Sequence, residues 1–216
     1  MASAVALDFG ADAPTYWADA CRHLMKRDRV MKKLIPQHAG VCLQSRGDAF
    51  VTLARSIVGQ QISVKSAQAV WDRFAALPQQ MTPAQVLTLK VDDMRAAGLS
   101  TRKVEYLVDL ALHFANHQVH EEAWGEMDDD AIIAELVAIR GIGRWTAEMF
   151  LLFHLLRPNV LPLDDVGLQN GISQRYFSGE PVSRSEIREL AAPWAPFCSV
   201  ATWYIWRSLD PAPVSY

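Results

Sequence analysis

Apolar residues that recur at helical spacing constrain this chain more than any other feature of its sequence. Between residues 101 and 115 they are Val104, Leu107, Val108, Ala111 and Leu112. An apolar side chain every three or four residues marks one face of an α-helix, whereas a half-buried strand alternates every second residue. Only the apolar residues around Val41 and the short stretch 159–163 suggest extended structure. The sequence therefore predicts an all-α protein.

Capping residues and prolines predict where the helices begin. Ser63 is a suitable N-cap, because its hydroxyl can accept a hydrogen bond from a free N–H of the first turn. Thr82 followed by Pro83 combines a cap with a proline in the first turn, where the missing N–H costs little. We expect about ten short helices. Helix starts are expected near Pro14, at Gly47-Asp48, at Thr82 and near Ser183. The helix that starts at Gly47-Asp48 has Phe50, Leu53, Ile57 and Val58 on one face. Helices with both ends marked are expected at 64–77, 101–115, 128–137, 144–156 and 197–209.

Length and composition exclude several classes of protein. A chain of 216 residues, half of them apolar, can form one large or two small domains without disulfide or metal staples. Its three cysteines form no CxxC pair, which argues against a zinc site or a cysteine-ligated iron–sulfur cluster and favours the reducing cytoplasm. We expect neither a secretory signal nor a membrane span, because the longest apolar stretch, 149–156, is too short to cross a bilayer.

The charge distribution does not by itself indicate a nucleic-acid-binding protein. The net charge is −3, with a basic run between Arg22 and Lys33 and an acidic run between Glu121 and Asp130. Solvated helix faces are the favoured interpretation of both runs. DNA is not excluded, because backbone amides and a few cations can hold a phosphate within an acidic protein.

The segment Gly141-Ile142-Gly143 separates a helical pattern that ends from one that begins. Glycine permits a positive φ and lets another backbone approach closely. The second helix offers free N–H groups and the positive end of its dipole, which suit a nucleic-acid phosphate. Ile142 would pack between the two helices and fix the turn. A simple helix C-cap with a tight turn explains the same residues, so both interpretations stay open at this point.

Several segments resemble the helix-hairpin-helix DNA glycosylase superfamily, in its DNA-3-methyladenine glycosylase II branch. They are IRGIGRWTAEMFLLF at 139–153, LPLDDVGL at 161–168, IVGQQISV at 57–64, AGLSTRK at 97–103, and the ending from Trp194-Ala195-Pro196-Phe197 to Trp206-Arg207. The resemblance covers roughly residues 15–210, in order and at compatible spacings. It implies an all-α helix-hairpin-helix glycosylase fold with two helical lobes and the active site in the cleft between them. One lobe would be a central bundle at about 45–155 that ends in the hairpin, and the other would combine about 1–44 with 156–216.

Asp165 occupies the position of the catalytic aspartate in that family. By its own chemistry, an Asp-Asp pair beside a helix start would favour a simple capping role, and we expect Asp164 to cap or to face solvent. Cleavage of an N-glycosidic bond develops oxocarbenium character on the sugar, which a nearby carboxylate stabilises. The same carboxylate can orient or deprotonate the attacking water. No second acid is required if the leaving base is an alkylated, already cationic purine.

Trp145 stands where superfamily members that also cleave the strand carry a lysine nucleophile. Without an amine there, no Schiff base with the sugar can form at that site, and the product would be an intact abasic site. Trp145 and Trp206 match pocket tryptophans of the branch, where an electron-rich ring would stack on a cationic base. Tyr204 is a weaker pocket candidate. Met149 replaces a tyrosine found in a relative and would soften one wall of the pocket.

The resemblance also implies how DNA would be held. Gln61 would be the wedge that fills the gap left by an extruded nucleotide, and Gln60 lies beside it on the same turn. Relatives often carry leucine at the wedge position. The other DNA-binding residues implied are Ser63, Gly141, Gly143, Arg144 and Thr146. Relatives bind a monovalent or divalent cation through hairpin carbonyls, which correspond to Val137, Ile139 and Ile142, in a structural role. Arg140 stands where proline is usual, and could loosen the turn or add a phosphate contact.

The resemblance implies a monofunctional DNA glycosylase that excises alkylated purines of the 3-methyladenine type from duplex DNA by base flipping, and so initiates base excision repair. It would need no organic cofactor, act as a monomer, and work in the cytoplasm on a bacterial nucleoid or in a eukaryotic nucleus. The alternative is a non-catalytic helix-hairpin-helix module that binds damaged or distorted DNA. Asp165, Trp145 and Trp206 favour the enzyme, because a phosphate clamp needs none of them. The preferred lesion stays open among 3-methyladenine, 7-methylguanine, ethenoadducts and hypoxanthine.

Overall fold

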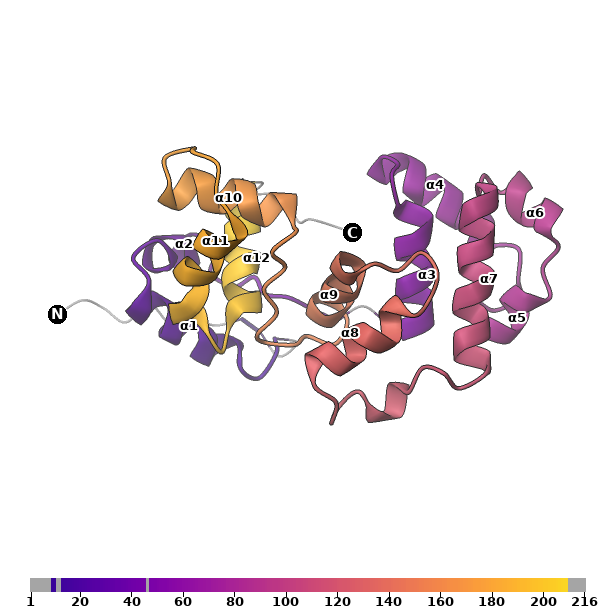
Figure 1. Ribbon diagram of the computed structural model, residues 1–216, viewed down its shortest axis with the longest axis horizontal. Helices are drawn as coiled ribbons and strands as arrows, with labels where there is room; N and C mark the ends of the chain where they lie inside the picture. Colours follow the sequence, from indigo (N-terminus) through magenta and orange to yellow (C-terminus); the bar gives the residue numbers. More distant parts are fainter. Residues whose placement is uncertain (1–8, 11–12, 46, 210–216) are drawn as a thin grey trace. The chain divides into compact units, whose positions relative to one another are not determined.

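All regular elements in the described part of the chain are helical (Figure 1). The computed structural model describes residues 9–10, 13–45 and 47–209. Its helices are α1 (Trp17–Arg27), α2 (Met31–Gln37), α3 (Ala49–Gly59), α4 (Val64–Ala75), α5 (Pro83–Leu87), α6 (Val91–Ala96), α7 (Thr101–Ala115), α8 (Asp129–Val137), α9 (Arg144–Phe153), α10 (Val166–Tyr176), α11 (Arg184–Ala191) and α12 (Cys198–Leu209), with short 3₁₀ turns at Glu121–Ala123 and Ala192–Trp194. The predicted all-α class is confirmed. The residues around Val41 and those at 159–163 are irregular rather than strands.

The predicted caps Ser63 and Thr82 are confirmed, and Asp48, predicted only to stand at a helix start, is a cap as well. The side chains of Asp48, Ser63 and Thr82 accept hydrogen bonds from backbone N–H groups three residues later, at the starts of α3, α4 and α5. The expected helix at 101–115 has those bounds in α7. The short helices α2 and α6 were not predicted, and both have few residues with which to show a periodic pattern.

Three predictions about the helices are wrong in detail. The helix expected at 64–77 ends at Ala75, and the one expected at 144–156 ends at Phe153. The chain leaves α9 because Leu156 adopts a left-handed φ of 53°, while the Arg157 N–H donates to the Leu151 carbonyl. Leu112, expected on the buried face of α7, is 41% exposed.

The chain forms two compact units, one from the described residues up to Ser45 and from Leu151 onward, and the other from residues 47–150. In the second unit, α7 lies between α3 on one side and the short α5 and α6 on the other (Figure 1). Its inner side chains, Leu107, Leu110, Ala111 and Phe114, are buried there, and Phe114 meets Phe50 of α3 edge-on. The packing of α7 on these helices turns Leu112 outward.

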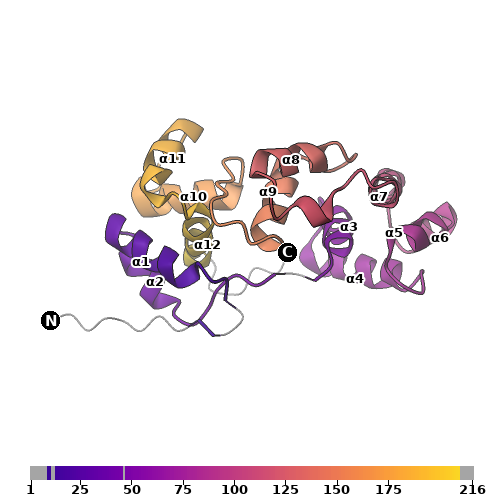
Figure 2. The ribbon, with the colours of Figure 1, turned by 90° about the horizontal axis from the view of Figure 1, so that it is seen from below.

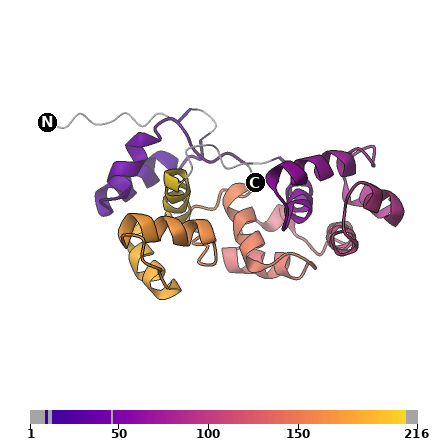
Figure 3. The same cartoon turned by 90° about the horizontal axis from the view of Figure 1, so that it is seen from above.

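In the first unit, α12 is the central helix. Its residues from Cys198 to Arg207 are all buried, and it lies between α1–α2 and α10–α11 (Figures 2 and 3). A Cβ at Gly171 of α10 would lie 2.2 Å from the Ile205 side chain, so this glycine allows α10 and α12 to approach closely. Asp28, just after α1, accepts hydrogen bonds from the Tyr176 hydroxyl and the Trp194 indole, which ties α1 to two other parts of the unit.

Among the described residues, the helices are all too short or too polar to be candidates for crossing a bilayer.

Candidate active site and nucleic-acid interface

Asp165 is a buried carboxylate at the start of α10. It is the N-cap of that helix, and its Oδ1 accepts the backbone N–H of Leu168 at 2.6 Å. The same oxygen accepts the indole N–H of Trp206 at 2.8 Å. Only 5% of Asp165 is exposed. The capping role is therefore present, and it orients the carboxylate at the positive end of the α10 dipole.

Trp206 is held on two sides in the same unit as Asp165. Its ring stacks on Phe153 with centroids 5.6 Å apart and an interplanar angle of 10°, while its N–H points at the aspartate. A Cβ at Gly167 would lie 3.0 Å from Asp165 Oδ1 and 3.1 Å from Trp206 Nε1. Gly167 therefore leaves the room in which these two side chains meet. Sequence reasoning missed Gly167 and Phe153, although both stand inside the motifs at 161–168 and 139–153.

Two other residues predicted near Asp165 have different surroundings. Asp164 is exposed and forms an ion pair with Arg184 at the start of α11, so it faces solvent as expected. Tyr204 is completely buried, with its hydroxyl 3.4 Å from the Cys21 sulfur and its ring edge-on to Trp203. Burial, together with Cys21, raises the pKa of the Tyr204 hydroxyl well above its usual value. The structure thus places Tyr204 in the core around α12.

The two hairpin glycines have different physical roles. Gly141 adopts φ 88°, and a Cβ there would lie 2.2 Å from the ring of Tyr106 on α7. Gly143 is exposed, is not left-handed, and has open space where a Cβ would stand. Ile142 is buried and its N–H donates to the Ile139 carbonyl at 3.1 Å. The turn itself therefore requires Gly141, while Gly143 leaves the start of α9 open to a ligand.

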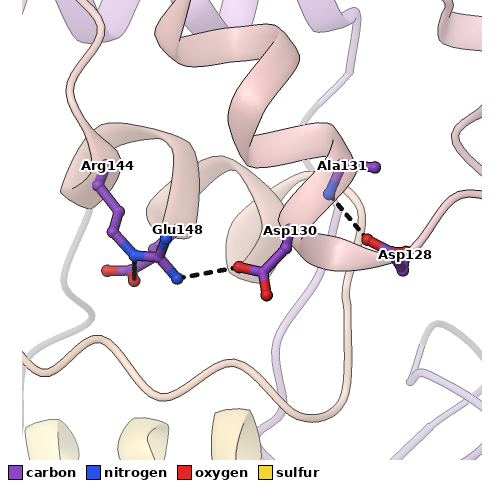
Figure 4. Close-up of polar contacts among 5 residues, drawn as sticks. All are labelled: Asp128, Asp130, Ala131, Arg144 and Glu148. Carbon is purple, nitrogen blue, oxygen red and sulfur yellow. Dashed lines mark hydrogen bonds and ion pairs between the residues drawn. The ribbon is translucent and has the colours of Figure 1, made fainter.

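Arg144, predicted to contact DNA, is engaged by two carboxylates. Its Nε donates to Glu148 at 3.0 Å, and its Nη2 donates to Asp130 of α8 at 3.1 Å (Figure 4). Glu148 is 7% exposed. The hydrogen bond to Asp130 is the largest of the effects that raise the pKa of Arg144. Arg144 thus joins α8 to α9, next to the Asp128 cap on Ala131 (Figure 4), and its contact with DNA stays a prediction.

Arg140 does not loosen the turn in which it lies. Its backbone N–H donates to Asp109 at 2.7 Å, and its guanidinium donates to Glu105 at 3.2 Å, both on α7. A proline at this position would lack that N–H. Arg140, which replaces the usual proline, therefore joins the hairpin to α7 through two hydrogen bonds.

The turn that follows α3 and carries the predicted wedge Gln61, called the wedge turn below, contacts the hairpin. The Gln60 amide nitrogen donates to the Gly141 carbonyl at 2.8 Å. Gln61 is exposed and has a left-handed φ of 60°, a conformation that costs a non-glycine residue about 1 kcal/mol or more. Ser63 then caps α4 through the Ser66 N–H at 3.2 Å. The structure thus brings together Gln60, Gln61, Ser63 and the hairpin within one unit.

Trp145, Thr146 and Met149 lie on α9, in the same unit as the hairpin. Trp145 is 39% exposed, and Met149 is half-buried one turn later on the same face of the helix. Thr146 is half-buried in the first turn. An exposed tryptophan beside a half-buried methionine offers an apolar surface, and its contact with a base stays a prediction.

Two proteins of similar sequence are described as DNA-3-methyladenine glycosylases. The chain is 28% identical over 204 residues to the putative DNA-3-methyladenine glycosylase YfjP of Bacillus subtilis, covering 90% of this chain and 71% of that protein. It is 29% identical over 180 residues to DNA-3-methyladenine glycosylase 1 of Schizosaccharomyces pombe, covering 82% of this chain and 79% of that one.

Solved structures with the same fold include proteins bound to DNA. The S. pombe 3-methyladenine DNA glycosylase in complex with abasic DNA has a TM-score of 0.79 and 28% identity, over 92% of this chain and all of that one. A DNA-3-methyladenine glycosidase from Bacillus halodurans has a TM-score of 0.81 and 32% identity, over 94% of this chain and 92% of that one. The family model described as HhH-GPD superfamily base excision DNA repair protein matches residues 54–196. Because that match includes the wedge turn, the hairpin and Asp165, the chain belongs to the HhH-GPD superfamily of base excision DNA repair proteins.

Proposed function

We propose that this protein is a monofunctional DNA glycosylase that removes alkylated purines, of the 3-methyladenine type, from duplex DNA. Asp165 carries the proposal, since it is a buried carboxylate oriented by two N–H donors at the family's catalytic position. The names of the relatives, DNA-3-methyladenine glycosylases, support the class of base. The chain would act as a monomer wherever the cell keeps its DNA.

The reaction assigned to Asp165 is hydrolysis. As the bond between the base nitrogen and C1′ breaks, positive charge develops on the sugar, and the carboxylate stabilises it. Water forms the new C1′–O bond and loses a proton, for which the carboxylate is the acceptor. A cationic alkylated purine leaves as a neutral base, so it takes the bonding electrons without protonation. Leu168 and Trp206 keep the carboxylate in place throughout.

The hairpin unit would hold the DNA. A backbone phosphate would approach the open start of α9 at Gly143. Ser63, Thr146 and the Arg144 guanidinium would be further contacts to the DNA backbone. Gln61 would fill the gap left by the extruded nucleotide. Trp145 and Met149 would contact the base, and Trp206 would serve the site mainly by positioning Asp165.

We further propose that catalysis needs no organic cofactor. A monovalent or divalent cation at the hairpin would be held by the carbonyl oxygens of Val137, Ile139 and Ile142 and would stabilise the turn. The Ile139 carbonyl accepts the Ile142 N–H, and a carbonyl oxygen has a second lone pair that could contact a cation. Among the described residues there is no cluster of three or more His, Cys, Asp or Glu side chains suited to a metal.

A panel of duplexes, each with one lesion, tests the proposed activity. We expect release of 3-methyladenine or 7-methylguanine well above release from an undamaged duplex, with hypoxanthine and ethenoadenine defining the range. The readout is free base, measured chromatographically under single-turnover conditions. Tight binding to lesion duplexes without release of any base would instead show a non-catalytic damage-binding module.

Absence of strand cleavage is a separate prediction. Because Trp145 replaces the lysine of strand-cleaving members, borohydride should trap no covalent protein–DNA complex, and the strand should break only after alkali. A lysine-containing glycosylase that cleaves the strand serves as the positive control. A trapped complex with this protein would contradict the monofunctional assignment.

A further inference from the structure

Two side-chain hydrogen bonds hold the turn that carries Gln61. The Lys103 ammonium donates to the Val58 carbonyl at 2.7 Å, in the last turn of α3. The Gln60 amide donates to the Gly141 carbonyl at 2.8 Å. Gln61 itself follows immediately, with its left-handed φ of 60°. A strained residue of this kind persists only where its surroundings determine it, and both hydrogen bonds hold residues just before it in the chain.

Helix α7 supports both contacts: it provides Lys103, and it also packs against the hairpin that accepts the Gln60 hydrogen bond. Lys103 lies in the first turn of α7, and Tyr106 and Asp109 follow at intervals of three residues, which keeps them on neighbouring positions of the helix. The Tyr106 ring fills the space beside Gly141, and Asp109 accepts the N–H of Arg140. One side of α7 therefore contacts both the α3 end and the hairpin.

Lys103 suits this position for electrostatic reasons. Its Nζ lies at the carbonyl end of α3, where the helix dipole favours a cation. Burial lowers the pKa of Lys103, which fits an ammonium enclosed against protein rather than extended into solvent. The side chain is half-buried, unlike that of Arg102 beside it, which is exposed.

We propose that Lys103 and Gln60 are positioning residues for base extrusion, which hold the Gln61 turn rigidly against the hairpin. The inference rests on the proposed wedge role of Gln61. A wedge competes with the partner base for the space in the stack, so it works only if its backbone does not yield. Without the two hydrogen bonds, Gln61 would relax toward an ordinary φ and its side chain would leave the gap.

Lys103→Met tests this inference, since it keeps the aliphatic stem and removes the donor. On a lesion paired with its normal partner, we expect base release to fall roughly tenfold, the effect of losing one charge-assisted hydrogen bond. On the same lesion opposite an abasic analogue, where extrusion costs little, release should fall less than twofold. Gln60→Met should show the same selective loss, and Lys103→Arg, which still donates, should recover most of the paired-lesion rate.

Two controls make the outcomes decisive. Lys32→Met removes an exposed cation from α2 and should leave both rates unchanged. Gln61→Ala tests the wedge itself. If Gln61→Ala loses rate selectively on the paired lesion and Lys103→Met does not, the inference is overturned. Equal losses on both substrates with Lys103→Met would overturn it too, because they indicate a general structural role. A wild-type protein that releases no base would mean instead that the proposed function has failed.

Discussion

Replacement of Asp165 by asparagine is expected to slow base release roughly 10²–10⁴-fold, the usual contribution of a general base at a reacting centre. The change removes the negative charge that stabilises the developing oxocarbenium ion. Asparagine keeps the Oδ1 acceptor for Leu168 and Trp206 and is itself a good N-cap, so α10 should stay intact. Single-turnover release from a 3-methyladenine duplex measures the loss, with the melting temperature and the Kd for abasic DNA as checks on folding and binding.

Asp164→Asn is the matched control, because it makes the same chemical change one residue earlier. Asp164 is exposed and pairs with Arg184, and the loss of an exposed ion pair has little effect on stability. We expect its rate to lie within about twofold of the wild-type rate, since surface pairs contribute little. A variant at Asp165 that releases bases as fast as the wild type would assign catalysis to another group.

Gly141→Ala is the substitution for which we expect the largest loss of stability. The left-handed backbone costs alanine about 1 kcal/mol or more, and the new Cβ would overlap the Tyr106 ring, which adds a cost of about 1–3 kcal/mol. The apparent free energy of unfolding should therefore fall by about 2 kcal/mol or more, measured by urea denaturation. DNA binding should weaken as well, because the hairpin moves.

Gly143→Ala separates the roles of the two glycines. Its Cβ meets open space at an ordinary φ, so the stability loss should not exceed about 1 kcal/mol, the cost of a poorer residue at a helix start. If a phosphate approaches this backbone, binding should nevertheless weaken. Measured against the Tyr106→Ser single variant, Gly141→Ala should lose only the backbone part, because the ring that its Cβ would overlap is gone. Equal stability of Gly141→Ala and the wild type would contradict the role assigned to the Tyr106 contact.

Local chemistry made the helix starts predictable. The side chains of Asp48, Ser63 and Thr82 each accept a hydrogen bond from the backbone N–H three residues later. Each interaction therefore involves only four consecutive residues. The predictions of where helices end were less accurate than those of where they begin. The end of α9 depends on the left-handed Leu156 and on a hydrogen bond from the Arg157 N–H to the Leu151 carbonyl. No glycine marks that position, and Pro158 comes only after it.

The sequence by itself determined the helical class and the hairpin, and its resemblance to known glycosylases pointed to Asp165. Tertiary structure decided what surrounds them, because the partners lie far along the chain: Trp206 is 41 residues from Asp165, and Gly141 is 81 residues from Gln60. The same reason explains why Arg144 meets Asp130 and why Leu112 is exposed. Periodicity reports contacts within one helix, whereas only the packing of helices brings distant donors to one acceptor.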